Sequence, residues 1–328
     1  MKAIRVHEAG GPEVLRLENI PDPEPGPDEV VVRMEAVGLN VVEVFQRSGK
    51  PPVPLPFTPG AEGAGTVMAL GAGVSHLHVG DRVTSESFKG TYAELAKAPA
   101  ARLVKLPDAV DTRSAAAVMM RGITAHYLAT STYPLRAGDR CLIHAAAGGV
   151  GLLLCRIAKH RGAWVVGTTS TPAKAKLVRE AGADEVILYP EHDVVAEVQR
   201  LTGGKGVHVV YDSVGKDTFD ESLDCLGLRG MMVLCGQASG PVPPVDPQTL
   251  LRKGSLFLTR ALFAHHVATP EELAGRVTDL LGWIGEGWLR VSIDRTFPLA
   301  AAAEAHRALE AHRALEIRET GVKMLLLP

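Results

Sequence analysis

The chain has 328 residues, of which 46% are hydrophobic and 22% charged, so it is long enough for two ordinary folded domains. Its 35 basic and 37 acidic residues nearly balance, which argues against a protein of nucleic acids or membrane surfaces, since these usually carry a basic excess. The four cysteines are scattered, which excludes a disulfide scaffold and favours a reducing cytoplasm. No cationic start precedes an apolar run, and no run reaches the roughly 18 residues that span a bilayer, so we expect neither a secretory signal nor a membrane anchor.

The N-terminal third is predicted to be rich in β-strands, because short apolar runs such as 30–32 and 65–70 alternate with glycine and proline turns. Two proline-rich segments, at 21–27 and 51–59, are predicted to be surface connections. The second of these could also form the wall of a binding cleft.

From about Pro134 the pattern changes to alternating strands and helices, which implies a parallel sheet with helices on both faces. The C-terminal part is predicted to hold a long helix, a short strand, a last helix and a final apolar strand. The predicted strands are 140–144, 164–168, 185–188, 207–211, 230–235 and 323–327, and the predicted helices are 149–160, 172–181 and 270–285.

The hexapeptide AHRALE occurs twice in tandem, at 305–310 and 311–316. Six residues advance an α-helix by about 600°, so equivalent residues lie roughly 240° apart. His306 and His312 therefore cannot share a face. We interpret the repeat as a duplicated helical segment and not as a metal-binding pair.

A glycine-rich loop, HAAAGGVG at 144–151, joins a predicted strand to a predicted helix. It fits the pattern G-x-G-x-x-G with alanine in place of the first glycine. Such a loop lets the backbone approach the pyrophosphate of a dinucleotide, which then binds at the N-terminus of the helix. The residues predicted to bind the cofactor here are Ala146, Gly148, Gly149, Val150 and Gly151.

The end of the second strand of this unit indicates which dinucleotide is bound. An NAD site usually has Asp or Glu there, about 20 residues after the glycines, to hold the ribose hydroxyls. This chain has Gly-Thr-Thr-Ser at 167–170 and no carboxylate. The hydroxyl of Ser170 and the amine of Lys174 suit a 2′-phosphate, so the sequence favours NADPH. The alternative is that Lys174 is an ordinary solvated lysine.

Several local strings together resemble the zinc-independent quinone oxidoreductase branch of the medium-chain dehydrogenase/reductase superfamily, and they span essentially the whole chain. These strings are VGLN at 37–40, RSG at 47–49, PGAEGAG at 59–65, GDRV at 80–83, GITA at 122–125, HAAAGGVG at 144–151, YDSVG at 211–215 and GSL at 254–256.

The resemblance also bears on metals. Relatives that use a catalytic zinc carry Cys where this chain has Asn40 and His where it has Ala61, so two of three ligands are absent. Their structural zinc needs four clustered cysteines, and residues 84–140 contain none. His76 and His78 are spaced His-x-His in a predicted solvated loop. We therefore expect no metal.

The resemblance implies an α/β fold with two domains. A GroES-like β-rich catalytic domain would comprise residues 1–120, a Rossmann domain with a doubly wound parallel sheet residues 121–261, and residues 262–328 would return to the first domain. NADPH would bind in the cleft between them, and two copies would dimerise by pairing edge strands. The implied function is NADPH:quinone oxidoreductase. Two alternatives stay open, namely reduction of activated C=C bonds in enones or enoyl thioesters, and a dinucleotide-binding protein with little turnover.

The family's catalytic residues map onto Asn40, Phe45 and Thr124. Asn40 and Phe45 would line the nicotinamide side of the cleft, and Thr124 would lie beside the nicotinamide ribose. The resemblance places the remaining cofactor contacts at Ser170, Lys174 and Tyr189 around the 2′-phosphate, at Val214, Gly236, Gln237, Ala261, Leu262 and Phe263 around the nicotinamide half, and at Arg318 near the chain end. Asn40 could instead satisfy backbone groups in a turn, Val214 could be core, and Arg318 could be a solvated helix charge.

The chain departs from its relatives at several positions. Relatives often have Tyr at the position of Phe45, and another Tyr two residues after the Ser48-Gly49 pair, where this chain continues with Lys50 and proline. Two phenols that could protonate or hydrogen-bond an enolate are therefore missing. Their absence weakens the enoyl-reductase alternative and leaves the proton donor open. Arg121 stands where relatives often have Lys.

Overall fold

The computed structural model describes residues 1–50, 52–314 and 323–328. The chain forms two compact units. The first comprises Met1–Ile123 and Thr269–Pro328, and the second comprises Thr124–Ala268. The segment 262–268, which was expected in the returning part, thus belongs to the second unit, and Arg318 lies outside the described residues.

The first unit is built on a mixed sheet whose central strand, β3, is buried along most of its length. All strand pairs in this sheet are antiparallel except β14 with β15. A separate antiparallel pair is formed by β1 (Lys2–Arg5) and β2 (Arg16–Asn19). The order in the main sheet is β14 (Ile293–Pro298), β15 (Lys323–Leu327), β3 (Glu29–Gly38), β4 (Gly63–Leu70), β5 (Arg82–Ser85) and β7 (Val104–Lys105), and β6 (Leu95–Pro99) also pairs with β3.

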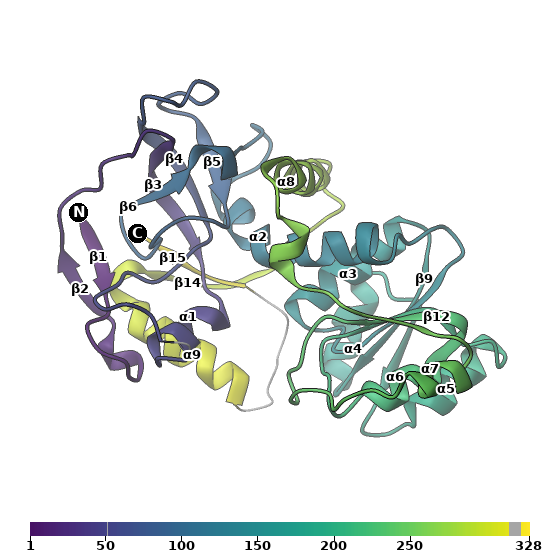
Figure 1. Cartoon of the computed structure of the whole chain (residues 1–328). Helices are drawn as coiled ribbons and strands as arrows, with labels where there is room; N and C mark the ends of the chain where they lie inside the picture. The colour runs from purple at the N-terminus through teal and green to yellow at the C-terminus, as the bar shows by residue number, and fades with distance from the viewer. Residues whose placement is uncertain (51, 315–322) are drawn as a thin grey trace. The chain divides into compact units, whose positions relative to one another are not determined.

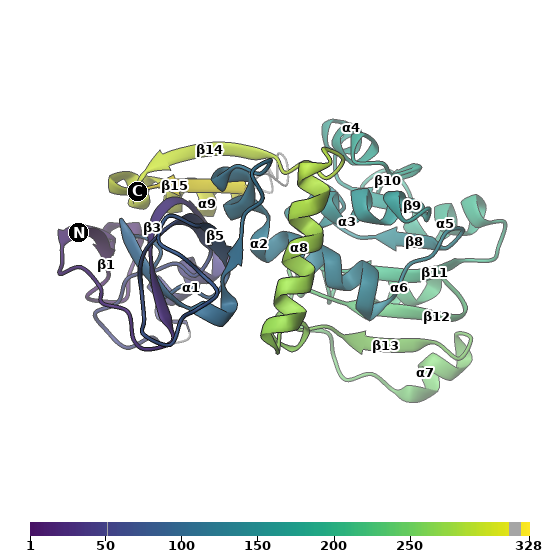
Figure 2. The same cartoon turned by 90° about the horizontal axis from the view of Figure 1, so that it is seen from above.

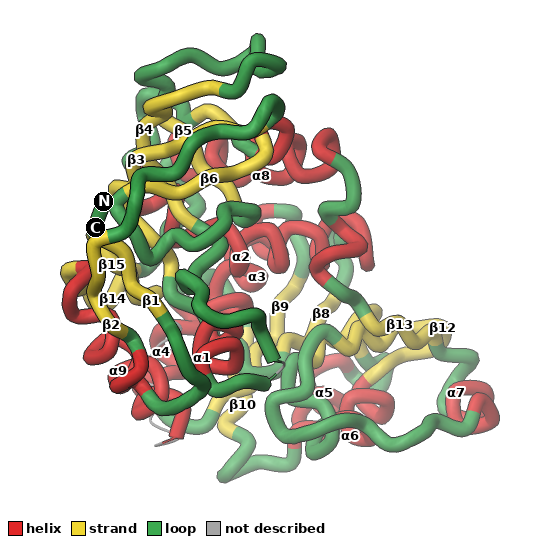
Figure 3. Tube along the Cα trace, turned by 60° about the vertical axis from the view of Figure 1, so that its left-hand side comes forward, coloured by secondary structure: helices red, strands yellow, loops and turns green. Residues whose placement is uncertain are grey.

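Helices complete the first unit. Helix α1 (Val41–Arg47) follows β3, and α9 (Ala302–Ala314) lies alongside it (Figure 1). Figure 3 shows α9, in red, beside the yellow strands β14 and β15. Helix α8 (Pro270–Gly285) begins where Thr269 Oγ1 accepts a hydrogen bond from Glu272 N at 3.2 Å, and its bounds match the prediction. Helix α2 (Thr112–Tyr127) crosses the boundary between the units.

The second unit contains a six-stranded sheet in which every pair is parallel. Its strands follow one another in Figure 2. If they are numbered one to six along the chain, their order is 3-2-1-4-5-6, which is the doubly wound order of dinucleotide-binding folds, so the fold class expected from the sequence is confirmed. The order is β10 (Glu185–Leu188), β9 (Trp164–Thr169), β8 (Arg140–Ile143), β11 (Val207–Asp212), β12 (Leu226–Leu234) and β13 (Phe257–Arg260).

Helices pack on this sheet in pairs, α3 with α4 and α5 with α6 (Figure 1). Strand β12 begins four residues earlier than predicted, because Gly227 and Gly230 make its start resemble a turn in the sequence. The helices are α3 (Gly149–His160), α4 (Pro172–Glu180), α5 (Val194–Thr202), α6 (Phe219–Cys225) and α7 (Pro247–Arg252). The shorter turns are η1 (Pro12–Val14), η2 (Ala100–Arg102), η3 (Leu128–Thr132, of π type), η4 (Phe263–His266) and η5 (Leu299–Ala301). Among the described residues, no helix is both long and apolar enough to cross a membrane.

Candidate cofactor and catalytic site

The predicted cofactor residues of the second unit share one edge of its sheet. The strands are parallel, so their carboxyl ends point the same way, and the register pairs Thr169 with Leu188 and Leu234 with both Asp212 and Arg260. The loops that follow these strands therefore lie side by side. The residues brought to this edge are Ala146, Gly148, Gly149, Val150, Gly151, Ser170, Lys174, Tyr189, Val214, Gly236, Gln237, Ala261, Leu262 and Phe263.

The glycine loop is closely packed. Gly148 is the N-cap of α3, and Ala146 N donates to Thr168 O at 3.0 Å. A Cβ at Gly151 would lie 2.6 Å from Ala146 O, and a Cβ at Gly167 would lie 2.8 Å from Ala146 Cβ. Small residues are thus required at these positions. The first amides of α3, which have no partner within the helix, are left at the sheet edge, where they fit a pyrophosphate.

A buried lysine lies next to the end of β9, the second strand of this sheet along the chain. Lys174 is buried at the start of α4, and its Nζ donates to Ser170 Oγ at 3.0 Å. Tyr189 N donates to Thr169 O at 3.2 Å, which places the exposed Tyr189 beside Ser170. Lys174 is therefore not the solvated lysine of the alternative interpretation. An amine and a hydroxyl, with a phenol beside them and no carboxylate at 167–170, fit the 2′-phosphate of NADPH.

Asp212, at the end of β11, organises the loop that was predicted to border the nicotinamide. Its Oδ1 accepts from Val214 N at 2.7 Å and from Gly215 N at 3.0 Å. Its Oδ2 accepts from Thr218 Oγ1 at 2.7 Å and from Ser222 Oγ at 3.0 Å. Asp212 belongs to the YDSVG motif at 211–215, but its role was not predictable from that motif alone. Val214 is half-buried at the sheet edge and is not part of the core.

In the first unit, Asn40 is held through its side chain and its backbone. Its backbone N donates to Glu43 Oε2 at 2.8 Å, which begins α1. Its side-chain Nδ2 donates to Glu62 Oε1 at 2.9 Å, and Lys323 Nζ donates to its Oδ1 at 2.7 Å. The amide of Asn40 thus bonds to two charged side chains, and Asn40 is also the N-cap of α1, where it forms a capping box with Glu43.

Glu62 and Lys323 are functional candidates that sequence reasoning missed. Both are almost completely buried and form an ion pair. Glu62 Oε2 also accepts from Met120 N at 2.8 Å. A Cβ at Gly38 would overlap the Glu62 carboxylate, so the glycine at the end of β3 makes room for it. The sequence did carry one signal for these two residues: Glu62 and Lys323 each stand at the start of an apolar strand.

Burial shifts the pKa values of several groups here. Burial raises the pKa of Glu43 to about 8, and repulsion from Glu62 adds to this shift. Burial lowers the pKa of Lys323, although Glu62 opposes this shift, and it also lowers the pKa of Arg121. The site thus combines charges that are costly to bury with partners that reduce the cost.

The other predicted catalytic residues occupy separate elements. Phe45 lies on α1 and is 39% exposed, which is unusual for an aromatic ring. Thr124 is half-buried on α2 and is the first residue of the second unit.

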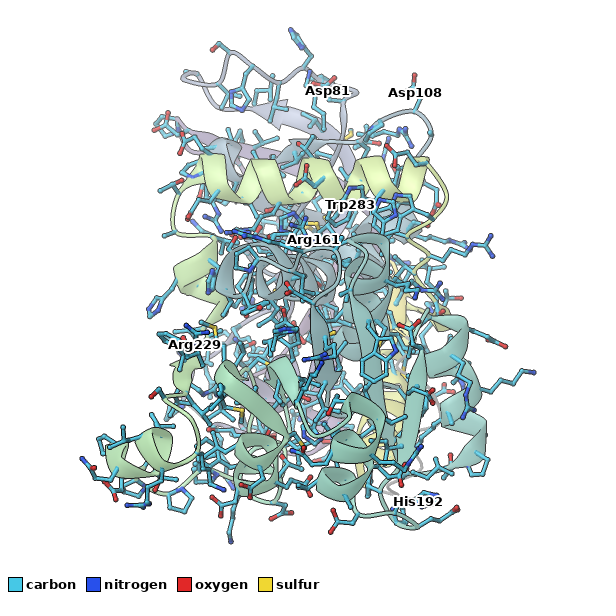
Figure 4. The ribbon with its side chains drawn as sticks, turned by 90° about the vertical axis from the view of Figure 1, so that its right-hand side faces the viewer. Asp81, Asp108, Arg161, His192, Arg229 and Trp283 are labelled. Atoms are coloured by element: carbon cyan, nitrogen blue, oxygen red, sulfur yellow. The ribbon has the colours of Figure 1, made fainter. Side chains whose placement is uncertain are left out.

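The His-x-His pair lies in an exposed loop of the first unit. His78 N donates to Asp81 Oδ2 at 2.8 Å, and Lys105 Nζ pairs with the same oxygen at 2.7 Å. Asp81, labelled in Figure 4, is on an outer loop of this unit. His76 Nε2 lies 3.2 Å from Ala100 O. Within the described ranges, no group of three or more His, Cys, Asp or Glu side chains is arranged to hold a metal ion.

Comparisons with known proteins agree with this geometry. Residues 26–108 match the model of the alcohol dehydrogenase GroES-like domain, and residues 149–279 match that of the zinc-binding dehydrogenase family. The chain is 47% identical to a quinone oxidoreductase of Pseudomonas aeruginosa, over 99% of both chains. It is 39% identical to a 2-haloacrylate reductase of a Burkholderia species, over 98% of both. The structure of Escherichia coli quinone oxidoreductase complexed with NADPH superposes with a TM-score of 0.90 at 40% identity, covering all of both chains.

We predict that replacing Glu43 with Gln changes how stability depends on pH. The pKa of Glu43 is raised from 4.5 to about 8 in the folded protein. The folded state therefore holds a proton that the unfolded state releases, so this group's stabilising contribution is present at low pH and is lost as pH rises through that window. Glutamine mimics the protonated form and does not show this loss.

Urea denaturation below and above this window tests the prediction. The Glu43→Gln variant should gain stability relative to the unmodified protein as pH rises. The exposed Glu24→Gln variant is the control and should follow the unmodified protein at every pH. Parallel pH curves for the unmodified protein and Glu43→Gln would show that the Glu43 carboxyl does not titrate in this range.

Proposed function

Because the chain belongs to the zinc-independent quinone oxidoreductase family of medium-chain dehydrogenases/reductases, we propose that it transfers a hydride from NADPH to a quinone. The observation that carries the cofactor half of the proposal is the buried Lys174 bonded to Ser170, at a strand end without a carboxylate. The P. aeruginosa relative, which matches over nearly the whole chain, supports the acceptor half.

The residues of the chain would bind and orient the cofactor. The first amides of α3 hold the pyrophosphate, and Lys174 with Ser170 holds the 2′-phosphate. The loop fixed by Asp212 presents Val214 to the nicotinamide half. When bound, NADPH supplies the hydride. Asn40 is the residue of the first unit that we assign to the carbonyl group of the acceptor.

A second candidate function is the reduction of an activated C=C bond. It is supported by the similarity to the 2-haloacrylate reductase. Both reactions add a hydride to an electron-poor system and leave negative charge on an oxygen, so one donor at that oxygen serves either. Phe45 cannot donate a proton to either acceptor, and the quinone is placed first because the chain is 47% identical to a quinone oxidoreductase and 39% identical to the 2-haloacrylate reductase.

The experiment that tests the proposal is a panel of quinones against a panel of enones and haloacrylates at saturating NADPH. We expect oxidation of NADPH with at least one quinone, at a higher kcat/KM than with any C=C substrate. Higher kcat/KM with the C=C substrates would favour the second candidate. Stoichiometric NADPH binding without oxidation by either panel would contradict both and point to a binding protein with little turnover.

We predict that Lys174→Ala weakens binding of NADPH by about 10- to 100-fold, because a charge-assisted hydrogen bond contributes roughly 1.5–3 kcal/mol. Binding of NADH should stay within about twofold, since it has no 2′-phosphate. Lys176→Ala is the matched control, because Lys176 lies on the same helix with its side chain 79% exposed. Titration by fluorescence or calorimetry measures both cofactors. An equal loss for NADPH and NADH would place the 2′-phosphate elsewhere.

We also propose that the protein is a cytoplasmic homodimer that pairs through β13, the last strand of the second unit's sheet. Phe257 and Leu258 on this strand are exposed, as are Leu228 and Leu251. Arg229, labelled in Figure 4, directly follows Leu228 and is also exposed. An edge strand with exposed apolar side chains favours pairing with another strand. The four free cysteines support a reducing compartment.

The dimer is tested by replacing Phe257 with Lys. We expect analytical ultracentrifugation to show a dimer for the unmodified protein and a monomer for Phe257→Lys, because a buried, unpaired charge opposes association. Val79→Lys changes an exposed apolar residue in the first unit and should remain dimeric. A dimer that survives Phe257→Lys would exclude this edge as the interface.

A further inference from the structure

Three side chains that are far apart in the sequence meet at one end of the first unit's sheet. Strand β15 pairs with β3 so that Leu325 faces Gly38, and β4 pairs with β3 so that Gly63 faces Val37. The residues next to these pairs are Asn40 after β3, Glu62 before β4 and Lys323 at the start of β15. The strand order therefore brings the three residues together.

The contacts among them fix the orientation of the Asn40 amide. The ammonium of Lys323 donates to Asn40 Oδ1 at 2.7 Å, and Asn40 Nδ2 donates to Glu62 Oε1 at 2.9 Å. A lysine can only donate and a carboxylate can only accept, so only one of the two amide orientations satisfies both partners. The ion pair between Lys323 and Glu62 holds these partners in place.

This arrangement also changes the strength of the amide as a donor. A cation at Oδ1 draws electron density from the amide, which strengthens the N–H groups of Nδ2 as hydrogen-bond donors. One of these N–H groups is used by Glu62. Within the described part of the chain, Glu62 is the hydrogen-bond partner of Asn40 Nδ2, and Asn40 is only half-buried. The remaining N–H is thus available to a ligand oxygen.

We propose that Lys323 and Glu62 are positioning residues that orient the Asn40 amide and strengthen it as a donor to the oxygen that becomes negatively charged when the acceptor takes up the hydride. This inference rests on the proposed function. It names the group that stabilises this charge in a chain that has Phe45, and not tyrosine, on α1. The negative charge forms as the hydride's electron pair enters the acceptor, and a proton taken up afterwards completes the reduction.

The first test needs neither cofactor nor turnover. The chain contains only two asparagines, Asn19 and Asn40. Selective ¹⁵N-asparagine labelling therefore gives two side-chain amide signal pairs, and the exposed Asn19 on β2 is an internal reference. We expect Lys323→Met to shift the Asn40 pair and leave the Asn19 pair unchanged. An unchanged Asn40 pair would overturn the proposal.

The second test is kinetic. We expect Lys323→Met to lower kcat by about 10-fold and Asn40→Ala to lower it by about 100-fold, with KM for NADPH within about twofold. Because Lys323 acts through Asn40, adding Lys323→Met to Asn40→Ala should cause little further loss. Additive losses would show that Lys323 has only a structural role.

Two further variants keep the test informative. If Lys323→Met does not fold, the neutral pair Lys323→Met with Glu62→Gln removes both charges of the buried ion pair and should show the same spectral shift and loss of kcat. Lys105→Met removes a cation from an exposed ion pair and should change neither readout. If the unmodified protein oxidises no NADPH with any acceptor, the proposed function fails, while the spectra still show whether Lys323 holds Asn40.

Discussion

The burial of Glu62 is the constraint on which the rest of the first unit's site depends. A carboxylate with almost no solvent contact is costly unless each oxygen is hydrogen-bonded and its charge is paired. Here Met120 N satisfies one oxygen, and Asn40 with Lys323 satisfies the other. These partners come from α2, the start of α1 and β15. The buried charge of Glu62, which directly precedes β4, thereby holds α2, the start of α1 and β15 together at that strand.

This constraint explains how the site can be organised although its residues are not those of a zinc centre. By the resemblance, zinc-dependent members of the superfamily would carry zinc ligands at the positions of Asn40 and Ala61. The cation next to Asn40 is then the ammonium of Lys323, which lies inside the protein. A lysine does not replace a metal as a Lewis acid, because it cannot accept a ligand's electron pair. It can only orient and polarise a neighbour, which suits acceptors that need one hydrogen bond.

The second unit was largely predictable from the sequence, because its signals are local. The glycine loop lies between a strand and a helix, and Ser170 and Lys174 are close in sequence, so motif spacing was enough. The pairing of Glu62 with Lys323 was not predictable, because 261 residues separate them and their contact depends on β15 returning beside β3. The burial of Lys174 also depends on packing around α4, which spacing does not reveal. Arg318 lies outside the described residues, so its role stays a prediction.

The most direct measurement is a crystal structure with NADPH and an unreactive quinone analogue bound. The proposed role of Asn40 requires its Nδ2 to lie within hydrogen-bond distance of a carbonyl oxygen of the analogue, while Lys323 Nζ remains on Asn40 Oδ1. The contrary result would be an analogue oxygen bonded to another side chain or to water alone, with Asn40 Nδ2 bonded to Glu62 and not to the analogue.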